Sequence, residues 1–245
     1  MWSVATIGTS PATLDLGASD QGSVAVTRLL FDGVVVANAV GFTEWTQSVF
    51  QVEVCESCGV EHCALGGWLT LRRIGEQAAF IPAFNEIAED GWTERAPPAY
   101  VRQRGVPLLA APVYAQVRAL IPGLPEIHAL PPITRGEAAH LFRFEAPAGI
   151  FEPDGHVRSP SESSIEASSD NDVESVIAAI HRLLALLDAS PAPATVAALP
   201  SAWRKITLYL RGGRQWQPLV YTLGTTLLHL DPEFVIAEVE AEDRT

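Results

Sequence analysis

Basic residues are scarce in this chain of 245 residues, and lysine is nearly missing. It has 16 lysines and arginines, of which only Lys205 is a lysine, against 29 acidic residues, so the formal net charge is −13. A phosphate backbone and an anionic membrane surface both attract a basic protein surface. We therefore expect no nucleic-acid partner and no membrane partner. The bias toward arginine, with abundant alanine and proline, is typical of a GC-rich bacterial coding sequence.

Long hydrophobic runs are also missing. The longest apolar stretch, residues 106–115, is interrupted by two prolines and is much shorter than the roughly 20 residues that span a membrane. Residues 1–17 have neither a positively charged start nor a continuous apolar core, so they predict no secretory signal. Hydrophobic residues still make up 48% of the chain, which is enough to build a core. We expect a cytoplasmic globular protein.

The common catalytic motifs are absent from the sequence. It contains no G-x-x-x-x-G-K-[ST], no G-x-G-x-x-G, no G-x-S-x-G and no H-E-x-x-H, which are motifs of nucleotide-binding proteins, hydrolases and zinc proteases. The zinc-ligand pattern of the nucleobase deaminases is missing as well. This favours a non-catalytic function and leaves enzymatic activity open.

Cysteine is rare, and its distribution is the most informative feature of the sequence. All three cysteines lie within nine positions, in the order Cys55, Cys58 and Cys63, with His62 among them. Thiolate and imidazole ligands at this spacing are those that zinc prefers. Three clustered cysteines in a chain without a secretory signal do not suit a disulfide framework. We therefore predict a zinc site formed by Cys55, Cys58, Cys63 and His62, and call residues 55–63 the cysteine loop.

The fourth ligand is the open part of this prediction. Side chains of adjacent residues such as His62 and Cys63 diverge, so a different histidine, a water molecule or no ligand at all could replace His62. The histidines considered are His128, His140, His156 and His229. The cluster is also compatible with reduced thiols without metal, with an iron–sulfur cluster and with a redox pair of Cys55 and Cys58.

A catalytic zinc ion is compatible with the same cysteines. Three protein ligands leave an open coordination position, and Glu53, Glu56 and Glu61 are close enough in sequence to act as a general base. Solvated loop charges are the simpler interpretation of these acids.

Hydrophobic periodicity places the cysteine loop between two strands. Residues 23–30 and 34–37 are predicted to form a hairpin around Asp32 and Gly33. Alternating apolar residues predict further strands over residues 48–54, 68–73 and 78–81. The cysteine loop, followed by Gly66 and Gly67, should connect the first two of these strands as a hairpin.

Helical patterns follow in the second half of the chain. Residues 112–121 begin with a proline and end before Pro122, and residues 135–142 have Thr134 as a helix cap. Residues 173–189 carry a long apolar stripe at helical spacing, with Asp172 as the cap. Four more strands are predicted at residues 205–211, 215–221, 225–230 and 234–240.

The predicted fold is α+β: an antiparallel β-rich N-terminal region, then a long helix and a C-terminal β-meander. Its parts are residues 1–151, an acidic Ser-rich loop or linker over 152–172, and residues 173–245, which could share one core with the first part. The function expected is that of an interaction or accessory protein with a protein partner and a zinc-stabilised cysteine loop. The competing hypotheses are a metal-dependent hydrolase using an open three-cysteine zinc site, and a protein with reduced structural thiols.

Overall fold

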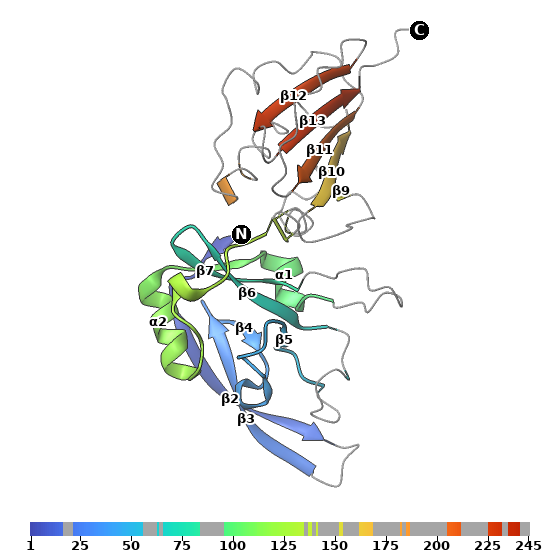
Figure 1. The fold of residues 1–245 in the computed structure, drawn as a ribbon. Helices are drawn as coiled ribbons and strands as arrows, with labels where there is room; N and C mark the ends of the chain where they lie inside the picture. Colours follow the sequence, from blue (N-terminus) through green and yellow to red (C-terminus); the bar gives the residue numbers. More distant parts are fainter. Residues whose placement is uncertain are drawn as a thin grey trace. The chain divides into compact units, whose positions relative to one another are not determined.

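The chain divides into two compact units. The computed structural model describes residues 1–16, 22–55, 63, 66–83, 96–134, 137–138, 141, 152–153, 162–168, 182, 185–186, 205–211, 225–231 and 235–240. Unit 1 comprises residues 1–85 and 92–132, and unit 2 comprises residues 86–91 and 133–245. The described elements form β-sheets with parallel and antiparallel pairs together with helices α1 and α2, so the protein is α+β (Figure 1).

The larger sheet of unit 1 contains five strands in the order β1-β8-β7-β6-β5. Strands β1 and β8 pair in parallel, and the other neighbours are antiparallel. The strands β6 and β7 agree with the predicted ones to within a residue at each end. The bounds are β1 Trp2–Ser3, β5 Phe50–Gln51, β6 Trp68–Ile74, β7 Gln77–Pro82 and β8 Pro107–Leu109.

The predicted strand 48–54 is shorter in the structure. Only Phe50 and Gln51 pair with β6. Beyond them the main-chain N–H of Asn38 donates to the Val52 carbonyl at 3.0 Å, and the Asn38 side chain binds Val54. The chain therefore changes partners at Val52, which a hydrophobic alternation by itself does not reveal.

The second sheet of unit 1 has the order β2-β3-β4, with bounds Ile7–Leu16, Gly22–Phe31 and Val34–Ala37. The β3–β4 hairpin is confirmed, and its turn residues Asp32 and Gly33 have φ values of 49° and 79°, as a two-residue hairpin turn requires. The sequence pattern does not predict strand β2, because its glycine and proline weaken the strand signal. It pairs with β3 over its whole length.

Helices α1 and α2 complete the described part of unit 1, together with the 3-10 turns η1, Val40–Phe42, and η2, Ile127–Ala129. Helix α2, Ala111–Leu120, matches the predicted helix, with a proline in its first turn. Helix α1, Ala99–Arg104, begins after Pro98 and has no counterpart among the predicted helices. Six residues are too few for a periodic pattern to stand out.

An aromatic cluster lies at the centre of the unit 1 core. Phe80 of β7 is 2% exposed, and its ring centroid lies 5.5 Å from that of Phe31, 6.3 Å from that of Phe50 and 6.4 Å from that of Trp45. The rings meet edge to face, the arrangement that aromatic quadrupoles favour. These four residues connect β3, β5, β7 and the segment after η1, and so fix the strand that leads into the cysteine loop.

Asp32 ties the N-terminal segment to the β3–β4 turn. Its carboxylate accepts the main-chain N–H groups of Thr6 at 2.7 Å and Ala5 at 3.0 Å. Partial desolvation raises the pKa of Asp32, but these hydrogen bonds outweigh it, and the net pKa is lowered. The carboxylate is thus a structural acceptor in its ionised form.

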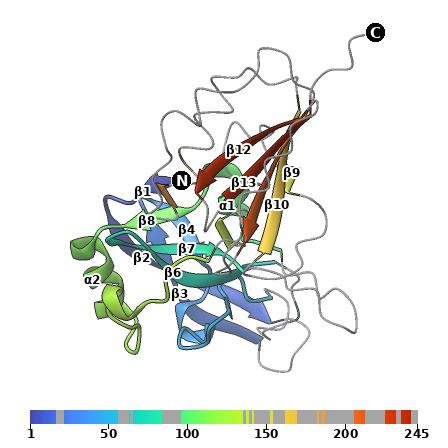
Figure 2. The same ribbon diagram turned by 45° about the horizontal axis from the view of Figure 1, so that its top comes forward.

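Unit 2 contains a sheet in the order β12-β13-β11-β10-β9, with all neighbours antiparallel. Its strands lie side by side in Figure 1 and Figure 2. The bounds are β9 Glu152–Pro153, β10 Glu162–Ser168, β11 Lys205–Arg211, β12 Thr225–Asp231 and β13 Val235–Glu240.

This sheet differs from the prediction in two respects. Strands β11, β12 and β13 coincide with predicted strands, but β13 lies between the other two, which a simple meander does not allow. Strand β10 falls within residues 152–172, which the composition predicts to be a loop or linker. Its Ser and Glu residues are weak strand formers, and pairing with all seven residues of β11 supplies the strand. The predicted strand 215–221 lies outside the described residues.

Some residues of the predicted helices 135–142 and 173–189 are described in unit 2, and they are helical. The Thr134 N–H donates to Glu137 Oε2 at 2.9 Å, and the Glu137 N–H donates to Thr134 Oγ1 at 3.2 Å. This reciprocal capping box confirms Thr134 as the cap of the predicted helix 135–142. Of the predicted long helix 173–189, the structure describes Arg182, Ala185 and Leu186 as helical; its other residues lie outside the described part.

Candidate metal site at the cysteine loop

The structure describes two of the four predicted zinc ligands. Cys55 is half-buried, directly after the buried Val54, and Cys63 is exposed. Cys58 and His62 lie outside the described residues. Within the described part of the chain, no three Cys, His, Asp or Glu side chains lie close enough together to bind a metal ion. Because half of the ligand set is outside that part, the zinc site stays a prediction.

The histidines considered as a fourth ligand are placed only in part. His128 is exposed in η2 of unit 1, and His229 belongs to β12 of unit 2. His140 and His156 lie outside the described residues. The fourth ligand therefore stays a prediction as well.

Asn38 holds the first arm of the cysteine loop, residues 51–55. Its Nδ2 donates to the Val54 carbonyl at 2.9 Å, and its Oδ1 accepts the Val54 N–H at 3.0 Å. The side-chain amide thus replaces the neighbouring strand that would otherwise satisfy both main-chain groups of Val54. Because Cys55 follows Val54 directly, the position at which its backbone starts is fixed by these two hydrogen bonds.

The second arm, residues 66–67, is hydrogen-bonded to the first. The Val52 N–H donates to the Gly67 carbonyl at 2.8 Å, and Gln51 Nε2 donates to the Gly66 carbonyl at 2.6 Å. Gly67 has a φ of +86°, and a Cβ added there would lie 2.5 Å from the Glu53 Cβ. Only glycine fits this conformation and this contact. The two arms therefore form a closed base under the cysteine loop.

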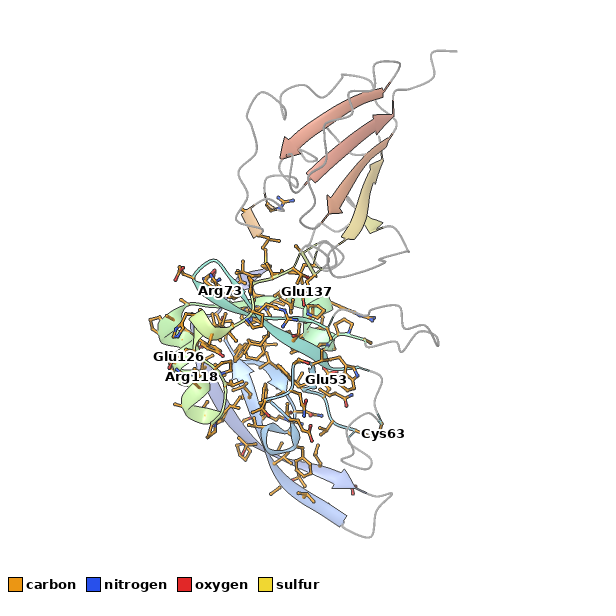
Figure 3. All side chains as sticks on the ribbon, viewed as in Figure 1. Glu53, Cys63, Arg73, Arg118, Glu126 and Glu137 are labelled. Atoms are coloured by element: carbon orange, nitrogen blue, oxygen red, sulfur yellow. The ribbon has the colours of Figure 1, made fainter. Side chains whose placement is uncertain are left out.

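Glu53 lies at this base, where a third segment joins the two arms (Figure 3). Its Oε1 accepts the N–H of Ala99, the first residue of α1, at 3.1 Å. A Cβ added to Gly66 would lie 3.4 Å from Glu53 Oε2, so the carboxylate also borders the second arm. Burial raises the pKa of the Glu53 carboxyl, and the Ala99 hydrogen bond opposes part of the rise.

Tyr100 is the buried neighbour of this carboxylate. Its side chain is 5% exposed, and its hydroxyl has no hydrogen-bond partner among the described residues. Burial raises the pKa of Tyr100, and the negative charge of Glu53 raises it further. The phenol therefore stays neutral.

Replacing Asn38 with alanine should lower the free energy of unfolding of unit 1 by about 1–3 kcal/mol, because both main-chain groups of Val54 lose their partner. Urea denaturation followed by tryptophan fluorescence measures the change. Gln47→Ala is the matched control, since Gln47 is an exposed amide in the same unit, and it should change stability by less than about 0.5 kcal/mol. Equal losses in the two variants would show that Asn38 does not hold the first arm.

A separate hollow of about 370 Å³ opens elsewhere on unit 1. Phe42 of η1 and Leu120 of α2 line it and are 37% and 44% exposed. The hydroxyl-bearing Thr9 and Thr27 come from β2 and β3, and none of the lining residues that the structure describes is titratable. Of the described cysteines, neither Cys55 nor Cys63 lines this hollow.

Sequence reasoning finds the cysteines but misses the residues that hold their loop. Asn38 follows a predicted strand without any signal of its own, and the sequence suggests Glu53 only as a candidate base. The Gly66-Gly67 pair is the one visible signal, because two glycines after a cysteine cluster indicate close backbone packing. The partners of that packing are distant in sequence and carry no pattern of their own.

Comparison with known proteins adds no relative: neither family models, curated proteins nor solved structures gave a match to this chain. No helix formed by the described residues is long and apolar enough to span a membrane.

Proposed function

We propose that this protein is a non-catalytic interaction or accessory protein whose cysteine loop is stabilised by a zinc ion bound by Cys55, Cys58, Cys63 and His62. The observation that carries the proposal is the closed base of the loop. Asn38 fixes the first arm and the second arm is hydrogen-bonded to it, so the segment that carries the ligands begins and ends at an anchored base. A structural zinc ion needs ligands that are brought together, which a closed base favours, and its binding then adds to folding stability.

The hollow beside Phe42 and Leu120 supports the interaction part of the proposal. Large exposed apolar side chains that converge on one hollow are a common feature of interaction sites. Since the described residues of the lining carry no charge, the partner suited to it is a protein that presents an uncharged apolar side chain. Phe42→Ser together with Leu120→Ser should abolish such binding while leaving the metal content unchanged.

Metal analysis tests the zinc part of the proposal. The full chain, purified without an affinity tag, should contain about one zinc per chain, and a chelator should lower its unfolding midpoint. The variant Cys58→Ser should lose the metal and become insensitive to the chelator. Ser48→Ala, a change at an exposed residue before β5, is the control and should keep both properties. Less than about a tenth of an equivalent of any metal in the wild-type chain would support reduced thiols instead.

The geometry of the bound ion separates the structural zinc site from a hydrolase site. X-ray absorption of the zinc protein should give four protein ligands, three of them sulfur. A coordinated water molecule in place of His62 would favour the open, catalytic site.

A further inference from the structure

Three segments that are distant in sequence meet at Glu53. The first arm of the cysteine loop contains Glu53 itself, the second arm packs against its backbone and Cβ at Gly67, and residues 96–100 form the third segment. The Trp68 N–H donates to the Ala96 carbonyl at 3.1 Å, and the Ala99 N–H donates to the Glu53 carboxylate. Among the described contacts, this carboxylate is the side-chain group that connects the base of the loop to the start of α1.

We propose that Glu53 is a positioning residue for the cysteine loop: it couples the arrangement of Cys55 and the affinity of the loop for metal to the start of α1. The metal half of this statement rests on the proposed zinc site, and the half that concerns Cys55 does not. Glu53 is two residues before Cys55, on the arm whose Val54 is also held by Asn38, so loss of the carboxylate removes one of the contacts that hold this arm.

The energetic basis is the hydrogen bond of 3.1 Å from the Ala99 N–H to the Glu53 carboxylate. A hydrogen bond to a charged carboxylate is shorter and stronger than one between neutral groups, and this one joins two segments 46 residues apart in sequence. The coupling is reciprocal by thermodynamic necessity. If the Ala99 contact stabilises the metal-binding arrangement of the loop, metal binding must stabilise the start of α1 by the same factor.

Cysteine alkylation of the metal-free protein tests the coupling without any zinc. Glu53→Ala removes the carboxylate and keeps the Cβ that packs on Gly67. The alkylation rate of half-buried Cys55, measured by peptide mass spectrometry, should rise about tenfold, because the arm opens more often. The rate of exposed Cys63 should stay the same. Glu53→Gln keeps an oxygen acceptor for the Ala99 N–H and should restore a rate close to that of the wild type.

Zinc binding tests the metal half. In competition with a chromophoric chelator, Glu53→Ala should bind zinc about 10- to 100-fold more weakly, as loss of other groups that orient metal ligands does. The Co²⁺-substituted variant at saturation should keep the thiolate absorption bands of the wild type, because the ligands are unchanged. In the wild type, zinc should slow amide hydrogen exchange at residues 99–104, and in Glu53→Ala this protection should disappear.

Tyr114→Phe provides the control for general destabilisation. It removes one hydrogen bond, from the Tyr114 hydroxyl to the Pro125 carbonyl at 3.0 Å, in α2 of the same unit. It should leave Cys55 alkylation and zinc affinity unchanged.

An unchanged Cys55 rate in Glu53→Ala, or an equal rise in Tyr114→Phe, would overturn the proposal. A wild-type chain that binds no zinc but shows the expected alkylation rates would overturn the zinc site and leave the role of Glu53 standing. An altered Co²⁺ spectrum in Glu53→Ala would instead make Glu53 a ligand, which contradicts a positioning role.

Discussion

Phe80→Ala should lower the free energy of unfolding of unit 1 by about 3–5 kcal/mol, the usual cost of deleting a buried ring. Phe80 is 2% exposed and contacts Phe31, Phe50 and Trp45. Its removal leaves a cavity between β3, β5 and β7. The further the surrounding residues collapse into that cavity, the smaller the loss of stability. Urea denaturation measures the loss, with Trp45 as a fluorescent reporter inside the cluster.

The matched control for Phe80 is Phe42→Ala. It deletes the same side chain at a place that is 37% exposed, so the expected loss is below about 1 kcal/mol. Phe80→Leu should fall between the two, because leucine refills most of the volume without the edge-to-face contacts. If Phe80→Ala and Phe42→Ala lost equal stability, the aromatic cluster would not be the centre of this core.

Gly67→Ala should cost about 2–4 kcal/mol, combining the strain of a left-handed residue with a backbone collision. The new Cβ would lie 2.7 Å from the main-chain nitrogen of Glu53 as well as 2.5 Å from its Cβ, and no rotamer change relieves a contact with backbone. The arms of the cysteine loop must separate to accept it. The same variant should therefore also accelerate alkylation of Cys55.

Gly75→Ala separates the two contributions to the Gly67 effect. Gly75, in the β6–β7 turn, has a φ of +54° and no atom within 4 Å of an added Cβ. It should cost only the conformational part, about 1–2 kcal/mol, without an effect on Cys55. If both glycine variants lost the same stability, the close approach of the two arms would not matter energetically.

The hairpin, strand and cap predictions succeed where the determinants are local. Asp32 and Gly33 define the β3–β4 turn by their own backbone preferences, a proline and a Pro-Gly pair delimit α2, and Thr134 caps its helix by contact with Glu137. Each of these signals acts over a few residues, so the sequence displays it directly. The α+β class follows from them.

The missed elements depend on partners that are distant in the sequence. Strand β2 contains a glycine and a proline and becomes a strand by pairing with β3, and β10 is rich in serine and pairs with β11. The order of β11, β13 and β12 likewise depends on which strands pair in the folded chain. Hydrophobic periodicity carries no information on pairing order.

For the candidate site, residue type and spacing were enough to identify the possible ligands: three cysteines and a histidine within nine residues, followed by two glycines. How that segment is held depends on contacts made in the folded chain. Asn38 satisfies both main-chain groups of Val54, Gly67 fits against Glu53 because it has no side chain, and Glu53 accepts the Ala99 N–H from 46 residues away. Thiol chemistry can be read from residue type, whereas the contacts that position a thiol exist only after the chain has folded.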